Sequence, residues 1–328
     1  MKVCVFGAGA VGGHLAVRLL TAHAADVSVV ARGPILRAIR ERGLTLHSAG
    51  QVLTATPAIA TDDPSTLPPQ DLVIVSIKAC TLPSLADALA GLIAPQGCAV
   101  FLLNGIPWWW NHGLPGASGP LPLVDPEGNL WTRLGPENAL GCVIYSPNDL
   151  KAPGVIVHDG LNRFVIGEPD RSPTARLSNA VELFRRAGVA AEASPDIRHE
   201  IWRKLVINAS GNPLCALTRL TQSEMIRDPE LGQLMVRVAK ESIAVGAALG
   251  WDVWSEVDVE KIATSAGRKK PPGIRSSMLQ DVLRKRPLEV EAQLGQIQAF
   301  ARECGIAVPT IDVILPLVRG LDRSLRKA

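Results

Sequence analysis

The chain has 328 residues, of which 47% are hydrophobic and 20% are charged, and its formal net charge at pH 7 is +3. This length allows two domains with cores of their own, and the composition is that of a folded soluble protein. The charge is too small, and the lysines and arginines too dispersed, to indicate nucleic acid as a partner. A modest positive charge can equally serve anionic small molecules.

The first twenty residues superficially resemble a signal peptide, because Met1 and Lys2 precede a mostly apolar stretch that extends to Leu20. Four glycines within seven residues, followed by His14 and Arg18, make this stretch a poor hydrophobic span. No other stretch reaches about 18 uninterrupted apolar residues, the minimum for a membrane helix. We therefore expect a cytoplasmic protein with no membrane partner.

The cysteines give no sign of a metal centre. The six of them stand at positions 4, 80, 98, 142, 215 and 304. They show neither paired metal-ligand spacing nor the density of a disulfide scaffold, and several lie in apolar runs. We expect reduced core thiols and no metal site.

Short β-rich runs alternate with helical runs through the first half of the chain. The expected strands and helices, in chain order, are strand 3–6, helix 10–22, strand 27–31, helix 34–42, hairpin-like structure over 44–60, strand 72–77, helix 82–93, strands 99–103, 140–145, 155–158 and 163–166, helix 173–187 and strand 189–193. This alternation predicts an α/β fold with a doubly wound parallel sheet, as in Rossmann-type dinucleotide-binding domains.

Strand patterns end near Pro195, and long amphipathic helices follow. They are expected at residues 197–218, 229–249, 276–284, 291–304 and 309–325. We therefore predict two domains, a Rossmann-type α/β domain at 1–194 and an all-helical domain at 195–328. The polar break at 267–273 is rich in Pro and Gly and is interpreted as a mobile loop.

A glycine-rich turn follows the first strand and begins the first helix. Its residues are Gly7, Ala8, Gly9, Ala10, Val11 and Gly12. A G-x-G-x-x-G between a strand and a helix binds a dinucleotide: the first glycine allows the tight turn, the second lets the pyrophosphate approach the backbone, and the third lets helix and strand pack closely. The amide groups at the helix N-terminus then hold the anion.

Polar residues follow three of the expected parallel strands. Arg32 stands where NAD-binding proteins carry an acidic residue for the ribose hydroxyls, and a cation there would pair with the 2'-phosphate of NADP. Arg32 as an ordinary surface residue is the alternative. Lys78 and Asn104 lie at the carboxyl ends of strands, where such sheets bind ligands, so we expect both to reach the cofactor.

Lys204, Asn208 and Asn212 recur at every fourth position of the helix expected at 197–218. This spacing places one ammonium and two amides on a single helix face. Their neighbours are apolar, and polar groups beside packed surface are costly unless something hydrogen-bonds to them. The face is therefore either a ligand site or a solvated helix face.

Taken together, these residues resemble the ketopantoate reductase (2-dehydropantoate 2-reductase) family over nearly the whole chain. The resemblance rests on residues 7–13, on Ile77-Lys78-Ala79, on Asn104-Gly105, on Trp202-Arg203-Lys204 with Asn208 and Asn212, and on Ser276-Ser277-Met278-Leu279-Gln280-Asp281 with Glu289. The last two blocks are the specific ones. A generic Rossmann dehydrogenase would share only the first.

The resemblance implies reduction of a 2-oxo acid by NADPH, most simply of ketopantoate in pantothenate biosynthesis. In this family pattern Lys204 is the general acid, Asn208, Asn212 and Ser277 hold polar groups of the substrate, and Glu289 contacts the substrate hydroxyl or Lys204. Ser277 could instead cap the helix at 276–284, and Glu289 could be a charge in the first turn of a helix. A homodimer is compatible with the apolar helical half.

The sequence departs from the family pattern after Asn104-Gly105, where Ile106-Pro107-Trp108-Trp109-Trp110 precedes a Gly- and Pro-rich stretch that extends to about Pro136. The tryptophans either pack domains or subunits together or reshape the pocket for a bulkier 2-oxo acid. Two further departures from the family pattern, Thr81, where the family often has Gln, and Ile274, also argue against ketopantoate as the substrate. Two alternatives therefore stay open, a paralogous reductase of a bulkier acid and a non-catalytic NADP(H)-sensing module. The proton donor Lys204 argues against the sensor.

Overall fold

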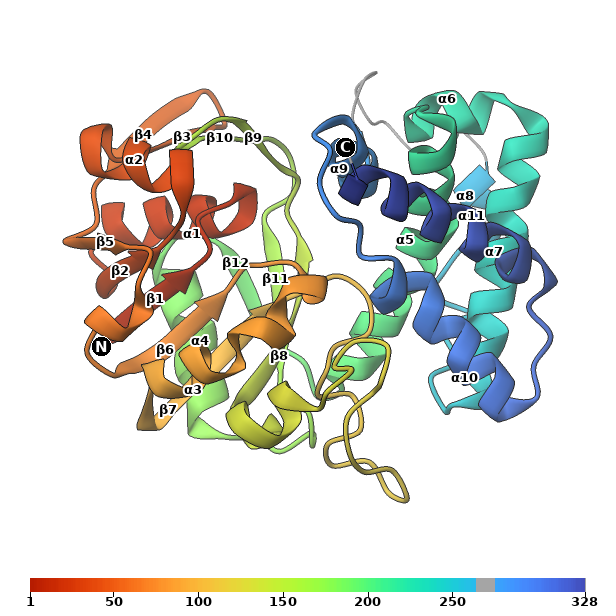
Figure 1. Ribbon diagram of the computed structural model, residues 1–328, viewed down its shortest axis with the longest axis horizontal. Coiled ribbons are helices and arrows are strands. Elements are labelled where there is room, and N and C mark those ends of the chain that lie inside the picture. The colour runs from red at the N-terminus through yellow and green to blue at the C-terminus, as the bar shows by residue number, and fades with distance from the viewer. Residues whose placement is uncertain (264–274, 328) are drawn as a thin grey trace. The chain divides into compact units, whose positions relative to one another are not determined.

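The computed structural model describes residues 1–263 and 275–327. The expected loop at 267–273 and Ile274 lie outside the described residues. The chain forms two compact units, Met1–Leu103 with Trp108–Ile197, and Asn104–Pro107 with Arg198–Ala328. Figure 1 draws the first unit from red to green and the second mostly from green to blue. The expected fold class is confirmed, with an α/β sheet in the N-terminal half and helices in the C-terminal half.

The first unit is built on a twisted sheet whose strand order, within the described residues, is β12-β11-β8-β7-β6-β1-β2-β5. Its strands are β1 (Lys2–Phe6), β2 (Asp26–Val30), β5 (Ile59–Thr61), β6 (Gln70–Val75), β7 (Ile93–Leu102), β8 (Ala139–Tyr145), β11 (Arg163–Gly167) and β12 (Ala190–Ala193). The chain leaves β1 toward β2 and β5 on one side and returns to β6, β7 and β8 on the other. This reversal beside β1 is the switch point where such sheets bind ligands.

All neighbours in this sheet are parallel except β8 and β11, which pair antiparallel. The expectation of a parallel sheet is therefore wrong at this one pair. The central strands are almost wholly apolar, as in Val3-Cys4-Val5-Phe6, because both faces of a parallel sheet are covered. The structure covers them with helices α1 (Ala10–Thr21), α3 (Ala86–Leu92) and α4 (Ala175–Arg186).

A second, four-stranded sheet in this unit has the order β4-β3-β10-β9, with β3 at Leu44–Ser48, β4 at Gln51–Ala55, β9 at Asn148–Ala152 and β10 at Val155–His158. The expected hairpin is confirmed in β3 and β4, whose turn residues Ala49 and Gly50 both have positive φ. Helix α1 contacts strands of both sheets. The strand β9 was not expected; it lies at the edge of this sheet and pairs antiparallel with β10, which itself pairs with β3 from a distant part of the sequence.

One expected helix begins differently. Residues Ala79–Leu85 form a 3₁₀ segment before α3, because Pro83 lacks an amide hydrogen and disfavours a regular α-helix there. The remaining short elements of the first unit are α2 (Gly33–Arg42), the 3₁₀ turns Pro64–Thr66 and Pro136–Asn138, and a π turn at Leu130–Leu134. The buried Asp125 carboxylate accepts hydrogen bonds from the amides of Leu130, at 3.2 Å, and Trp131, at 3.0 Å.

The second unit contains helices and, among its described residues, no strand. Its elements are α5 (Ile197–Thr218), α6 (Gln222–Arg227), α7 (Pro229–Ala248), α8 (Val259–Ala263), α9 (Ser277–Leu283), a π turn at Glu291–Gly295, α10 (Gln296–Cys304) and α11 (Pro309–Lys327). Trp202 of α5 donates from its indole to the Ser242 carbonyl of α7 at 3.1 Å, and Gly246 provides the space for its ring. Within the described part of the chain, no helix is long and apolar enough to cross a membrane.

Four of the cysteines are buried thiols, as expected, but Cys80 is exposed and Cys304 is half-buried. The core prediction is therefore wrong for Cys80. Burial raises the pKa of Cys4 to about 12 and that of Cys98 to about 11, because a thiolate would lose its hydration there.

A buried histidine should make the first unit sensitive to acid. His14 of α1 is fully buried, its Nδ1 lies 2.8 Å from Asn148 Oδ1, and its ring meets that of His158 at 4.6 Å. Burial first, then the charges of His158 and Arg18, lower the pKa of His14 from 6.5 to about 3. In the unfolded chain the His14 imidazole therefore binds a proton below pH 6.5, whereas in the folded chain it binds one only near pH 3.

Stability should consequently fall as the pH drops below 6.5, by up to about 1.4 kcal/mol per pH unit from this group. At pH 5 the loss from His14 would be about 2 kcal/mol relative to neutral pH. Urea unfolding of the wild type and of His14→Gln across pH 4.5–8 measures it. The variant should lose most of this slope and keep the smaller contribution of His158, whose pKa burial also lowers. Equal slopes in the two proteins would contradict the assignment.

Candidate functional site

The glycine-rich turn joins β1 to α1 at the switch point of the large sheet. Gly7 has φ +101, and its amide donates to the Val30 carbonyl of β2 at 2.9 Å. A Cβ on Gly12 would lie 1.9 Å from the Gly7 carbonyl oxygen, whereas a Cβ on Gly9 would meet no atom within 4 Å. The backbone conformation at Gly7 and the close packing at Gly12 thus require glycine. Gly9 instead leaves open space beside the N-terminus of α1, where an anion would bind.

The structure places the two predicted cofactor cations at the carboxyl edge of the same sheet. Arg32 follows β2, is exposed and precedes α2 at its N-terminus. Lys78 follows β6, is half-buried and precedes the 3₁₀ segment. Because β2 and β6 are the two neighbours of β1, both side chains begin at strand ends that flank the glycine-rich turn. Their contact with a cofactor stays a prediction.

Asn104 follows β7, but residues 104–107 group with the helical unit. The Lys204 ammonium donates to Asn104 Oδ1 at 3.0 Å. Two residues that are 100 positions apart in sequence therefore meet, and an amide oxygen holds the half-buried ammonium in place. The sequence motifs did not predict this contact, because they gave Asn104 to the cofactor and Lys204 to the substrate.

Lys204, Asn208 and Asn212 all lie on α5, as predicted. Lys204 and Asn208 are half-buried, whereas Asn212 is only 4% exposed and its amide donates to Gln293 Oε1 at 3.4 Å. A solvated helix face is therefore wrong for Asn212. The stripe starts at partly open positions and ends at the buried Asn212 inside the helical unit.

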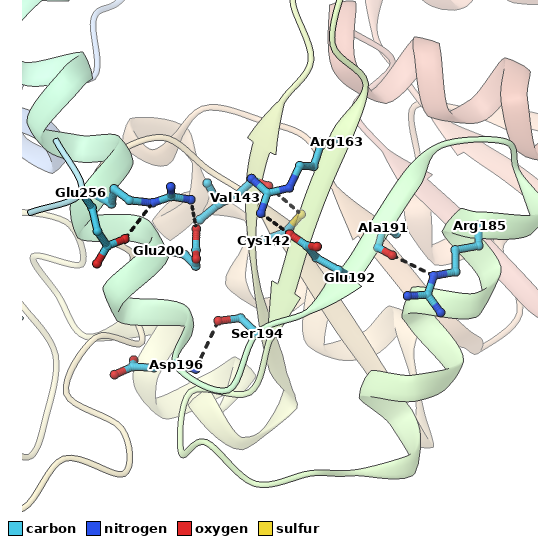
Figure 2. A network of polar contacts seen from close by, with 11 residues as sticks. Cys142, Val143, Arg163, Arg185, Ala191, Glu192, Ser194, Asp196, Glu200 and Glu256 are labelled. Atoms are coloured by element: carbon cyan, nitrogen blue, oxygen red, sulfur yellow. Dashed lines mark hydrogen bonds and ion pairs between the residues drawn. The ribbon is translucent and has the colours of Figure 1, made fainter. Parts of the chain in front are cut away.

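Charged contacts hold the beginning of α5, which carries this stripe (Figure 2). Arg203 donates to Glu200 at 2.6 Å and lies 3.7 Å from Glu256, which also accepts from His199 Nε2 at 2.5 Å. Partly exposed ion pairs of this kind contribute roughly 0.2–1 kcal/mol each. Together they tie α5 to the segment that follows α7, and so they orient the turn that carries Lys204.

The helix α9 is capped by Ser276, whose Oγ accepts from the Leu279 amide at 3.3 Å. Ser277 is the first residue of the helix and is exposed, so the capping alternative is wrong for Ser277. Glu289 is half-buried and precedes the π turn, so it is not a first-turn helix charge either. Both remain candidates for contact with a substrate.

The three consecutive tryptophans are buried, with 1–2% of each side chain exposed. The Trp108 ring packs edge-to-face on Phe101 of β7 at 5.4 Å. Gly141 of β8 lies under the Trp109 ring, since a Cβ there would come within 2.6 Å of it. This burial favours the packing alternative.

Among the described residues, no group of three or more histidines, cysteines and carboxylates could hold a metal ion.

Comparison with known proteins gives the family. Residues 3–171 match the model "Ketopantoate reductase PanE/ApbA", and residues 196–322 match its C-terminal counterpart. A 2-dehydropantoate 2-reductase from Mesorhizobium japonicum is 38% identical over 98% of both chains, and one from Archaeoglobus fulgidus is 31% identical over 99% of both. This chain belongs to the ketopantoate reductase family. It is accordingly an oxidoreductase of that family.

Solved structures agree with the family assignment. A ketopantoate reductase of the same family from Ralstonia eutropha is 28% identical, with a TM-score of 0.82 over 99% of this chain and 100% of the other. A D-mandelate dehydrogenase solved with NADH and anilino(oxo)acetate has a TM-score of 0.81 at 22% identity, with the same coverage. The second likeness shows the fold alone. The same fold therefore accompanies more than one activity.

Proposed function

We propose that the protein uses NADPH to reduce the ketone of a 2-oxo acid to a 2-hydroxy acid, most simply 2-dehydropantoate to pantoate in pantothenate biosynthesis. The observation that carries this proposal is the half-buried Lys204 ammonium, held by Asn104 on a helix that also carries Asn208 and Asn212. Two 2-dehydropantoate 2-reductases, which are 38% and 31% identical over nearly the whole chain, support 2-dehydropantoate as the substrate.

The proposed chemistry needs one hydride and one proton. A bound NADPH would supply the hydride for the ketone carbon, and the carbonyl oxygen would then carry the electron pair of the broken π bond. Lys204 stabilises the developing alkoxide and donates a proton to it, which leaves NADP⁺ and the hydroxy acid. General acid catalysis by a positioned group is worth roughly 10²–10⁴-fold.

The remaining residues would bind and orient the substrate. Asn208 and the exposed Ser277 offer donors for its carboxylate or hydroxyl groups, and Asn212 lies on the same helix face one turn further into the unit. Glu289 is proposed to contact the product hydroxyl or the Lys204 ammonium. No hydrogen bond to the Asn208 side chain is found among the described residues, which leaves its amide for a ligand.

The cofactor is proposed to lie along the carboxyl edge of the large sheet, with its pyrophosphate at Gly9 and at the N-terminus of α1. Gly7, Ala8, Ala10, Val11 and Gly12 shape this turn. Lys78 would contact the phosphates, and Asn104 the nicotinamide side. Because the chain offers Arg32 rather than a carboxylate after β2, NADPH is proposed over NADH.

Replacing Arg32 by aspartate should reverse the cofactor preference. A guanidinium pairs with the 2'-phosphate of NADPH, whereas a carboxylate repels it and accepts from the ribose hydroxyls of NADH. We expect kcat/KM for NADPH to fall by about 10²-fold, since losing a charge-assisted pair costs about 3 kcal/mol. Steady-state kinetics with both cofactors measures this. Arg37→Asp, an exposed arginine of α2, is the control. An unchanged ratio of the two kcat/KM values in Arg32→Asp would show that Arg32 does not recognise the phosphate.

A reductase of a bulkier 2-oxo acid is the second candidate, since the fold is shared with a D-mandelate dehydrogenase. A panel of 2-oxo acids that includes ketopantoate and an aryl 2-oxo acid, followed by NADPH oxidation, separates the two. A clear maximum of kcat/KM at ketopantoate supports the first candidate, and a maximum at an aryl acid supports the second. Tight NADPH binding without turnover of any acid would favour the sensing module. A homodimer stays a prediction that the same preparation can test by light scattering.

A further inference from the structure

A π turn at Glu291–Gly295 connects the segment after Glu289 to α10. The i→i+5 hydrogen-bond pattern is rare and is often found at functional sites, because the extra residue in the turn redirects the neighbouring groups. Three consecutive residues of this turn each contact a different element of the helical unit. The contacts involve Glu291, Ala292 and Gln293, and none of these residues carries a role in the proposed chemistry.

Ala292 holds the segment that contains Asn104. The Ile106 amide donates to the Ala292 carbonyl at 2.7 Å. Gly105 has φ +82, and a Cβ on it would lie 2.3 Å from the same carbonyl oxygen and 2.6 Å from its carbon. The chain can therefore lie against the π turn here only because residue 105 is glycine. The residue before it, Asn104, is the one that accepts from Lys204 at 3.0 Å.

Gln293 holds Asn212. It is 1% exposed, and its Oε1 accepts from Asn212 Nδ2 at 3.4 Å. An amide group can bind through either its oxygen or its nitrogen, and a buried acceptor at one side decides which atom faces the other way. Gln293 thus directs the Asn212 nitrogen toward itself. The Asn212 oxygen is left for the opposite side.

Glu291 fixes the turn to α11. Its two carboxylate oxygens accept from Arg319 Nε at 2.8 Å and Nη2 at 2.5 Å, a bidentate arrangement that restricts both position and orientation. Gly295 adds close packing, because a Cβ there would lie 2.2 Å from the Glu291 carboxylate. Arg319 therefore fixes the turn to α11, while Ala292 and Gln293 of the same turn contact the segment of Asn104 and the amide of Asn212.

We propose that this π turn is the positioning element of the catalytic site: through Gly105 and Ala292 it places Asn104 against Lys204, and through Gln293 it orients Asn212. This assignment rests on the proposed function for the roles of Lys204 and Asn212. Gly105 and Gln293 are positioning residues, since they act through Asn104 and Asn212. Their substitution should have separate kinetic effects, the first on proton transfer and the second on substrate binding.

The first test is Gly105→Ala. The added methyl group must push the segment away from Ala292 and move Asn104 from Lys204, so kcat should fall on the order of 10²-fold, as expected for a misplacement of about 1 Å. NADPH binding, followed by nicotinamide fluorescence, should weaken far less than kcat falls, because the glycine-rich turn proposed to hold the pyrophosphate is unchanged. In an Asn104→Ala background the same change should lower kcat by less than about twofold, because the group it displaces is already absent. Additive losses in the double variant would overturn the proposal.

The matched control is Gly250→Ala. Gly250 has φ +92 in the same unit, but a Cβ there meets no atom within 4 Å. It carries a comparable backbone strain without the collision, so its kcat should stay within about twofold of wild type. A fall in kcat as large as that of Gly105→Ala would show that strain alone explains the effect, and it would overturn the role of Ala292.

Gln293→Met tests the second arm with a side chain of similar length and no acceptor oxygen, and it covers the case in which Gly105→Ala does not fold. KM for the 2-oxo acid should rise about tenfold with kcat changed less, and the rise should vanish in an Asn212→Ala background. An unchanged KM, or a rise that persists without Asn212, would overturn this arm.

A crystal structure of Gly105→Ala gives a readout that needs no activity. The distance from Lys204 Nζ to Asn104 Oδ1 should exceed hydrogen-bonding distance. Retention of the 3.0 Å contact in the variant would overturn the proposal even if kcat falls. If the wild type reduces no 2-oxo acid, the proposed function fails, and this distance still decides whether the π turn positions Asn104.

Discussion

Replacing Lys204 by alanine should lower kcat by roughly 10²–10⁴-fold, the range for loss of a general acid that also stabilises a developing oxyanion. The ammonium is half-buried and its direction is fixed by Asn104, so water entering the vacated space would be a poorer and less ordered donor. The affinity for NADPH should change little, because the glycine-rich turn belongs to the other unit. Single-turnover oxidation of bound NADPH at saturating 2-oxo acid measures the chemical step.

Lys240→Ala serves as the matched control. Lys240 lies on α7 of the same unit, where it pairs with Glu260 at 3.6 Å, and half of its side chain is exposed. Its removal should leave kcat within about twofold, since exposed pairs contribute little. Near-normal turnover by Lys204→Ala, with the control also normal, would remove Lys204 from the proton transfer and return the stripe on α5 to a structural role.

Gly9→Ala should weaken cofactor binding in a protein that otherwise folds normally. The backbone of Gly9, at φ −72 and ψ −159, is open to any residue, and the new Cβ would meet no protein atom within 4 Å. That space is where the pyrophosphate must approach the backbone. We expect the Kd for NADPH to rise by at least about tenfold, which corresponds to about 1.4 kcal/mol. The melting temperature should stay within about 2 °C, the shift that a change of roughly half a kcal/mol produces.

Gly12→Ala is the contrasting variant on the same turn. Its Cβ would lie 1.9 Å from the Gly7 carbonyl oxygen, so β1 and α1 must separate. Overpacking of this kind costs about 1–3 kcal/mol, and the melting temperature should fall by roughly 2–12 °C. The two glycines are thus expected to differ, one in binding and the other in stability. A Gly9→Ala protein with wild-type NADPH affinity would show that the pyrophosphate does not lie at this turn.

Much of the fold could be predicted because it depends on local patterns. Helix α5 has its expected bounds, Ile197–Thr218, and the strand-turn-helix around Gly7 lies where the motif requires it. The errors occur where distant residues decide. The strand β9 belongs to a sheet in which its partner β10 pairs with the distant β3, and the antiparallel pair of β8 and β11 depends on the path of the chain between them. Pro83 was a visible signal for the 3₁₀ segment before α3.

In the candidate site, too, local patterns could be predicted and contacts between distant residues could not. The residue types on α5 and the motif after β1 predicted which residues to examine, and the resemblance supplied their roles. Neither predicted that Asn104 would meet Lys204, because a hydrogen bond across 100 positions leaves no periodic signal. Gln293 was also missed. The glutamines at 293, 296 and 298 in the helix expected at 291–304 were the signal that the sequence offered, and the structure buries all three.

By itself, the sequence determined the α/β class, the glycine-rich turn after β1 and the helix that carries Lys204, Asn208 and Asn212, because each follows from contacts between residues close in the chain. The tertiary structure alone decided that Asn212 is buried against Gln293, that Ser276 rather than Ser277 caps α9, and that the three tryptophans pack inside. The physical reason is that the burial of a residue and its hydrogen-bond partners depend on which distant segments pack against one another. A residue's neighbours in sequence restrict its backbone, but only its neighbours in space decide whether its polar atoms face a partner or a ligand.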